Sequence, residues 1–199
     1  MNLPNRLTVL RIILIPSILL FMLPLPAIRQ TADWNAFIIG YGRIVALVLF
    51  SAAALTDLAD GMIARKRNQV TTLGKFLDPI ADKILVISVL IALIQTGRLS
   101  ALIAIIVIIR EFVITGLRLI AIDKGVVIAA GQLGKAKTVS QIVAILVVLA
   151  EPILVLFFGA WIPAIWFTRI GDLAMLTAVV LTLISGYNYL RSGLLYLKE

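Results

Sequence analysis

Six long apolar runs, separated by short polar breaks, restrict what this chain can fold into. They cover about residues 7–27, 36–64, 76–97, 100–122, 136–160 and 168–195. Each run is near the roughly 20 residues that a helix needs to cross a bilayer, and none alternates as a membrane β-barrel strand does. The chain has 199 residues, of which 62% are hydrophobic and 14% are charged, so no separate soluble domain fits. The sequence predicts an all-α integral membrane protein with six transmembrane helices in a single domain, residues 1–199.

The positions of the basic residues predict how the spans are oriented. With the N-terminus inside, 14 of the 18 lysines and arginines fall on the cytoplasmic side, and four fall outside: Arg29, Arg43, Arg98 and Arg169. Cytoplasmic ends of membrane helices are enriched in Lys and Arg. We therefore expect both termini in the cytoplasm and the protein in the inner (cytoplasmic) membrane of a cell. Residues 5–11 have a polar side chain at every third position, which predicts an interfacial helical segment that leads into the first span.

Histidine and cysteine are both absent. Disulfides and thiolate metal sites are therefore excluded, and so is the commonest general base. Catalysis would have to use carboxylates, lysine, tyrosine, serine, threonine or a bound metal. The net charge of +8 favours a partner with phosphates, either an anionic lipid surface or a phosphorylated substrate, and no nucleic-acid partner is expected.

Four aspartates lie where the second and third spans approach each other. Asp57 and Asp60 are three residues apart, and Asp78 and Asp82 are four apart, so each pair shares one helix face. The spans run antiparallel around the basic loop 66–74, which brings the four carboxylates to matched depths. A single such residue can reach water or pair with a nearby cation. Four together repel one another, and each costs about 2.5–3.5 kcal/mol at the membrane centre, so the group favours a functional site.

Hard divalent cations are the simplest way to neutralise these carboxylates. Oxygen ligands suit Mg²⁺, Mn²⁺ or Ca²⁺, and two such ions favour phosphoryl chemistry because they bridge phosphate oxygens. The small residues Gly61, Ala64 and Gly74 would let a bulky ligand approach the backbone, although close helix packing explains them equally well. Arg65 and Lys75, at the mouth of the site, could hold a phosphate or face lipid headgroups.

The aspartates belong to a longer motif, which reads Asp57-x-x-Asp60-Gly61-x-x-Ala64-Arg65, eight residues, Gly74-x-x-x-Asp78-x-x-x-Asp82. This motif resembles the complete signature of the CDP-alcohol phosphatidyltransferase family. The resemblance implies a six-helix membrane enzyme, usually a homodimer. It also implies that the enzyme transfers a phosphatidyl group from CDP-diacylglycerol to an alcohol and releases CMP.

The same resemblance implies roles for individual residues. The metal, two Mg²⁺ or Mn²⁺ ions, would be held by Asp57, Asp60, Asp78 and Asp82. Asp82 would also be the catalytic general base, since a carboxylate beside a metal-bound phosphate can take a proton from a hydroxyl. CDP-diacylglycerol would contact Asp57, Gly61, Ala64, Arg65 and Gly74, with Lys75 at the mouth. Thr8 and Arg11 would close over its headgroup, although an interfacial anchor explains these two residues equally well.

A second set of basic residues bears on the acceptor alcohol: Arg110, Arg118, Lys135, Lys137 and Arg191. Arg110 lies near the middle of its span, where an arginine is a functional hypothesis by default, although Glu111 or Glu151 could pair with it. Arg118 and Lys135 lie nearer the cytoplasm and could instead anchor their helices at the lipid surface. Together these cations could form a pocket for an acceptor that carries a phosphate.

Three further segments resemble one branch of the family: residues 110–118, residues 134–138 and the N-terminal Asn5-x-x-Thr8-x-x-Arg11. That resemblance implies glycerol 3-phosphate as the acceptor and phosphatidylglycerophosphate as the product. Alternatives are the same chemistry with phosphatidylglycerol, inositol phosphate or serine, or a cation-coupled transporter with an acidic ion site. The transporter leaves the motif spacing unexplained, and a purely structural membrane protein leaves the four aspartates unexplained.

Overall fold

The structure is a computed structural model that describes residues 3–26, 28–67, 72–123 and 131–194, without the side chains of residues 3–4, 58–67, 72–76, 192 and 194. Every regular element in these ranges is a helix, as predicted. Six long helices correspond to the six apolar runs: α1 (Leu3–Met22), α3 (Arg43–Arg67), α4 (Thr72–Gln95), α5 (Ala101–Asp123), α6 (Gln132–Phe158) and α7 (Ala164–Leu194).

The second apolar run is divided among several helical types. The short elements η1 (Arg29–Thr31), α2 (Ala32–Phe37) and the π-helical η2 (Ile38–Gly42) precede α3. Gly42 ends the π-helical turn against α1, where an added Cβ would overlap the carbonyl oxygen of Phe21. This close approach requires glycine, and it shows why the run starting at about residue 36 is not one uninterrupted α-helix.

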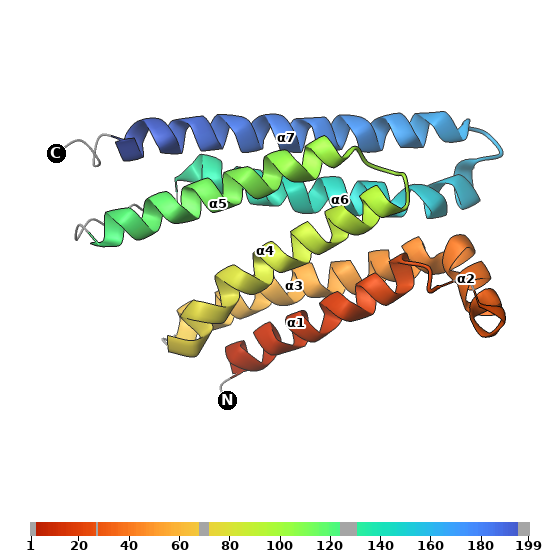
Figure 1. The fold of residues 1–199 in the computed structure, drawn as a ribbon, viewed down its shortest axis with the longest axis horizontal. Coiled ribbons are helices and arrows are strands. Elements are labelled where there is room, and N and C mark those ends of the chain that lie inside the picture. The colour runs from red at the N-terminus through yellow and green to blue at the C-terminus, as the bar shows by residue number, and fades with distance from the viewer. Residues whose placement is uncertain (1–2, 27, 68–71, 124–130, 195–199) are drawn as a thin grey trace.

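The long helices form a bundle in which α1, α3 and α4 pack together and α6 runs beside α7 (Figure 1). Helix α3 also contacts α6, and α5 contacts α7. The start of α1 and the end of α7 lie toward the same end of the bundle (Figure 1). Fully buried side chains from α1, α3, α4 and α6 fill the centre, among them Ile18, Phe50, Leu90, Ile145 and Leu149.

The outside of the bundle is apolar as well. Large side chains such as Ile39, Phe112 and Leu156 are more than two-thirds exposed, as expected for surfaces that face lipid. In the described part of the chain, four segments are long and apolar enough to cross a membrane: Asn5–Met22, Arg29–Asp57, Gln132–Phe158 and Ala164–Arg191. The other two long helices, α4 and α5, carry several charged residues.

The first helix differs from the predicted interfacial segment. Helix α1 is one helix from Leu3 to Met22, and its polar residues Asn5, Thr8 and Arg11 are buried. Their spacing of three places them on one face, and α1 packs against α3 and α4. The polar pattern therefore marks a face turned into the protein, because α3 and α4 supply polar partners for it.

Charged residues also tie the helices together at the other end of the bundle. The carboxylate of Glu151, on α6, accepts hydrogen bonds from Arg43 at 2.8 Å and from Arg98 at 2.7 Å. Arg98, in the connection after α4, also lies 2.7 Å from Asp172 of α7. The hydrogen bond with Glu151 raises the pKa of Arg98 above its ordinary value, so this residue stays protonated and holds these helix ends together.

Candidate active site

Two residues of α1 join the predicted carboxylates of α3 and α4. Arg11 is completely buried; its Nη2 lies 2.9 Å from Oδ1 of Asp57, and its Nη1 forms an ion pair with Oδ1 of Asp82. One turn earlier, Thr8 Oγ1 donates a hydrogen bond of 2.6 Å to Oδ1 of Asp78. We call these five residues the carboxylate cluster. Three of the four predicted aspartates therefore meet around α1, which contacts both α3 and α4.

The aspartates explain why α1 can bury an arginine. A buried guanidinium is strongly unfavourable unless it is paired, and its planar fork can donate to two carboxylates at once. Arg11 makes these two contacts to helices that are far apart in sequence, Asp57 on α3 and Asp82 on α4. Arg11 therefore lies inside the site, and the alternative of an interfacial anchor is wrong for this residue.

The remaining motif residues lie on the same two helices. Asp60, Gly61, Ala64 and Arg65 are in α3, and Gly74 and Lys75 are in α4, but their side chains lie outside the described residues. Their predicted contacts with metal and nucleotide stay predictions.

The chemistry of the carboxylate cluster bears on the predicted metal. Its acidic members offer only hard oxygen donors, which suit Mg²⁺ or Mn²⁺. The side chains of Asp57 and Asp82 are 33% and 42% exposed, so an ion from solution can reach them. Among the side chains that the structure describes, no three acidic residues form a ready metal-binding group. The donor chemistry fits a hard divalent cation, and the fourth predicted ligand, Asp60, lies one turn along α3 from Asp57.

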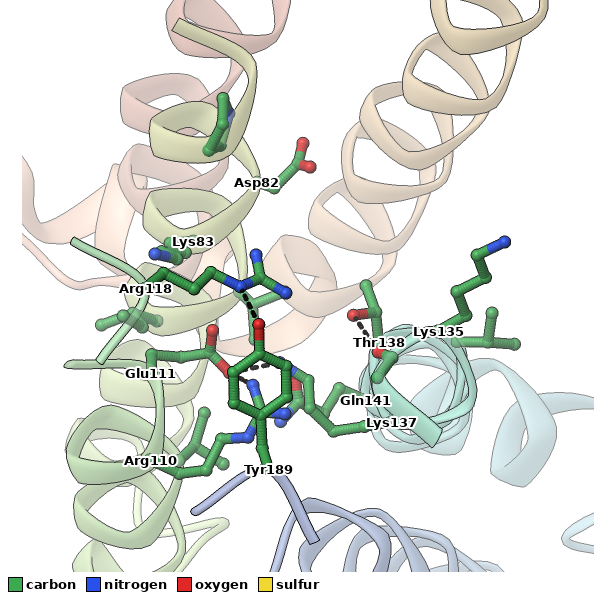
Figure 2. Close-up of a pocket in the computed structure, with 16 residues that line it drawn as sticks. Asp82, Lys83, Arg110, Glu111, Arg118, Lys135, Lys137, Thr138, Gln141 and Tyr189 are labelled. Carbon is green, nitrogen blue, oxygen red and sulfur yellow. Dashed lines mark hydrogen bonds and ion pairs between the residues drawn. The ribbon is translucent and has the colours of Figure 1, made fainter. Parts of the chain in front are cut away.

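A cavity of about 420 Å³ opens beside the carboxylate cluster, within the range of small-molecule sites. Asp82 belongs to both, because it pairs with Arg11 and also lines the cavity. The charged lining has five cations and two carboxylates (Figure 2): Lys83, Arg110, Arg118, Lys135 and Lys137, against Asp82 and Glu111. This excess of positive charge suits an anionic ligand.

Two cations of the cavity lining, Arg110 and Lys137, share the carboxylate of Glu111. Glu111 Oε1 accepts a hydrogen bond of 3.2 Å from Nη1 of Arg110 and forms an ion pair with Nζ of Lys137. Nη2 of Arg110 donates to Oγ of Ser185 at 2.7 Å. Arg110 passes α7 beside Gly186, where an added Cβ would lie 3.2 Å from its Cγ. Of the two predicted ion-pair partners of Arg110, Glu111 is confirmed, whereas Glu151 pairs elsewhere.

The other three cations of the lining differ in exposure: Lys83 and Arg118 are half-buried, and Lys135 is exposed. Lys83 Nζ donates to Oγ1 of Thr115 at 2.6 Å. Arg118 Nε donates to the hydroxyl oxygen of Tyr189 at 2.7 Å, and Lys135 is exposed at the rim. Figure 2 shows Arg118 between Asp82 and Tyr189. The cavity is therefore lined both by cations that have hydrogen-bond partners and by an exposed cation.

Four of the five predicted acceptor residues line the cavity, and Arg191 does not. Arg191 is exposed on α7, and it lies outside the cavity lining that contains Tyr189. Residues two apart on an α-helix point in nearly opposite directions. Because Tyr189 lines the cavity, Arg191 faces away from it, and the predicted role of Arg191 in acceptor binding stays a prediction.

Sequence reasoning also missed several residues of the site. Lys83 is adjacent to Asp82 and was not assigned a role, and the polar residues Thr182, Ser185 and Tyr189 of α7 were overlooked. Gln141 lines the cavity and donates to Oγ1 of Thr182 at 2.9 Å. The available signal was the spacing of three and four residues between polar side chains in an otherwise apolar span.

The comparisons with known proteins cover nearly the whole chain. The model of the CDP-alcohol phosphatidyltransferase family matches residues 1–184. A Bacillus subtilis (strain 168) relative is 40% identical over 195 residues, which cover 94% of this chain and 93% of the relative. Relatives from Rickettsia bellii and Shigella flexneri serotype 5b are each 36% identical, over 193 and 198 residues, and each match covers 96% of this chain and 94% of the relative. All three relatives are named CDP-diacylglycerol–glycerol-3-phosphate 3-phosphatidyltransferase.

Proposed function

Because this chain belongs to the CDP-alcohol phosphatidyltransferase family, we propose that it transfers the phosphatidyl group of CDP-diacylglycerol to glycerol 3-phosphate. The products are phosphatidylglycerophosphate and CMP, in agreement with the names of the relatives. One observation carries the proposal: Asp82 belongs both to the carboxylate cluster and to the lining of a cationic cavity. A donor held at the cluster and a phosphate-bearing acceptor held in the cavity would meet at this carboxylate.

The reaction divides between these two halves of the site. Arg118, Lys135 and Lys83 bind the phosphate of glycerol 3-phosphate, and the glycerol hydroxyl attacks the β-phosphorus of CDP-diacylglycerol. A new phosphorus–oxygen bond forms to glycerol, the bond from that phosphorus to the CMP phosphate breaks, and CMP leaves. Asp82 accepts the proton of the attacking hydroxyl. This carboxylate lines the cavity that holds the acceptor, so it lies near the hydroxyl that must lose the proton.

Divalent metal belongs to the proposal as well. Two Mg²⁺ or Mn²⁺ ions, held by Asp57, Asp60, Asp78 and Asp82, would stabilise the negative charge that develops on the phosphate oxygens. Arg11 and Thr8 contact three of these carboxylates and hold α3 and α4 at a fixed separation. Gly61, Ala64, Arg65, Gly74 and Lys75 would surround the cytidine and its phosphates.

We place all six long helices across the cytoplasmic membrane, with both termini in the cytoplasm. The charges of α4 and α5 support this arrangement, because Asp82, Lys83, Arg110, Glu111 and Arg118 all line the cavity and so need not face lipid. The cavity residues of α6 lie in its first half and Tyr189 lies in the second half of α7, whereas the cavity residues of α4 and α5 lie around the middle of these helices. For α6 and α7, these parts lie toward the bundle end where α1 begins and α7 ends (Figure 1), and we propose that a water-soluble acceptor enters from that end.

An acceptor panel tests the proposed function. Purified protein receives CDP-diacylglycerol, Mg²⁺ or Mn²⁺, and one acceptor at a time, and CMP release is measured. We expect release with glycerol 3-phosphate and little with phosphatidylglycerol, inositol phosphate or serine. Preference for another acceptor would overturn the acceptor assignment, and no CMP with any of them would favour the transporter. The predicted homodimer is tested separately, by measuring the molar mass of the protein in detergent with light scattering.

A further inference from the structure

Three polar side chains form a stripe along α7 that faces residues of the cavity lining, and one of them, Tyr189, belongs to the lining itself. Thr182, Ser185 and Tyr189 are three and four residues apart, so they share one helix face. Thr182 accepts a hydrogen bond from Gln141, Ser185 accepts one from Arg110, and Tyr189 accepts one from Arg118, at 2.9, 2.7 and 2.7 Å. Each member of this α7 stripe thus contacts a residue that lines the cavity. The pairing suggests that α7 orients the lining side chains.

The contact between Tyr189 and Arg118 has two parts. The phenol oxygen accepts the Nε–H of Arg118 at 2.7 Å, and the guanidinium carbon lies 5.1 Å from the centroid of the tyrosine ring. The ring contact is within the range of a cation–π interaction. The hydrogen bond and the ring contact both restrict the orientation of the Arg118 guanidinium.

The bond to Tyr189 uses only the Nε–H of the Arg118 guanidinium, so the Nη groups remain available for a ligand. Nη1 and Nη2 of Arg118 make no hydrogen bond to any side chain in the described part of the molecule. Figure 2 shows one of these two nitrogens pointing toward Asp82, away from the tyrosine ring. An arginine binds a phosphate best through two parallel N–H groups. Arg118 can therefore keep its bond to Tyr189 while it binds a phosphate bidentately.

We propose that Tyr189 is a positioning residue that fixes the guanidinium of Arg118 for a phosphate monoester acceptor. This inference rests on the proposed function and extends it to a residue that does not itself need to touch the substrate. An arginine side chain that is free to rotate must be ordered when the ligand binds, and that cost weakens binding. Loss of the tyrosine hydroxyl should therefore raise the Michaelis constant for the acceptor and leave the chemical step nearly unchanged.

The first test is Tyr189→Phe, which removes the hydroxyl and keeps the ring. We expect the KM for glycerol 3-phosphate to rise about tenfold, the factor that a hydrogen bond to a charged group carries. The kcat and the KM for CDP-diacylglycerol should stay within about twofold of the wild-type values. Tyr187→Phe is the matched control, since Tyr187 is on the same helix and 66% exposed, and it should change none of these constants.

A double-mutant cycle with Arg118→Met separates positioning from general packing. Arg118→Met removes the guanidinium and should raise the acceptor KM by itself; adding Tyr189→Phe should then raise it by less than about twofold. Melting temperatures of all variants report whether each is folded. An unchanged acceptor KM in folded Tyr189→Phe, or equal effects of this substitution with and without Arg118, would overturn the positioning role. Failure of the wild-type protein to release CMP with glycerol 3-phosphate would instead overturn the proposed function.

Discussion

The buried arginine of α1 gives the sharpest test of the carboxylate cluster. Arg11→Met keeps the length and most of the apolar stem of the side chain and removes the charge that bridges Asp57 and Asp82. The two carboxylates would then face each other without their shared cation, and α1 would lose its ion pairs to α3 and α4. We expect both the stability of the protein and the turnover of CDP-diacylglycerol to fall.

The expected magnitude follows from the burial of the partners. Breaking a fully buried ion pair costs about 3–5 kcal/mol. Arg11 is fully buried, but the side chains of Asp57 and Asp82 are 33% and 42% exposed, so water can partly solvate them and the cost falls. We take about half of the full value, roughly 2 kcal/mol of unfolding free energy, which corresponds to about a thirtyfold change in the folding equilibrium constant.

The assay compares two arginines of the same helix. Arg11→Met should lower the free energy of unfolding by roughly 2 kcal/mol and kcat/KM for CDP-diacylglycerol by more than about threefold. Arg11→Lys should lower both less, since an ammonium keeps the charge but not the two-pronged geometry. Arg6 is exposed on α1, so Arg6→Met should stay close to wild type. Turnover of Arg11→Met within threefold of wild type, or an equal loss in Arg6→Met, would refute the role given to Arg11.

Four other predictions follow from the two halves of the site. Asp82→Asn should keep binding of CDP-diacylglycerol, measured by competition, but lose at least about a hundredfold in kcat; full activity would remove Asp82 as the base. Arg118→Ala and Lys135→Ala should each raise the KM for glycerol 3-phosphate more than the KM for CDP-diacylglycerol, and equal rises would argue against the acceptor cavity. Removal of divalent metal with EDTA should stop CMP release, and added Mg²⁺ or Mn²⁺ should restore it. Glu151→Gln should lower the unfolding free energy by about 3 kcal/mol, because it weakens a buried bridge between two arginines, while the acceptor KM should not change.

Much of the fold followed from the apolar runs, because a run of about 20 apolar residues has few alternatives to a helix. The boundaries of α4 and α5 agree with the predicted spans to within a few residues. The meeting of Asp57, Asp78 and Asp82 was also predictable, since helical spacing and an antiparallel connection set their relative depth. Local periodicity was sufficient for these features.

Features that depend on which helices pack together were not predictable in the same way. The spacing of Thr8 and Arg11 gave them a common face, but only the packing of α1 on α3 and α4 shows that this face is buried. Similarly, the sequence placed Arg191 among the cations of the acceptor pocket, but the rotation of α7 about its axis brings Tyr189 to the cavity lining instead. Helix rotation depends on contacts across the whole bundle, and a single sequence does not specify it.

The most direct test of the account is to follow the acceptor itself. The wild-type protein is reconstituted into vesicles that contain CDP-diacylglycerol, and radiolabelled glycerol 3-phosphate is added with Mg²⁺. We predict that the label enters the lipid fraction as phosphatidylglycerophosphate, with one CMP released for each label incorporated. Label that remains water-soluble, even if it crosses the membrane, would contradict the transferase and favour a transporter.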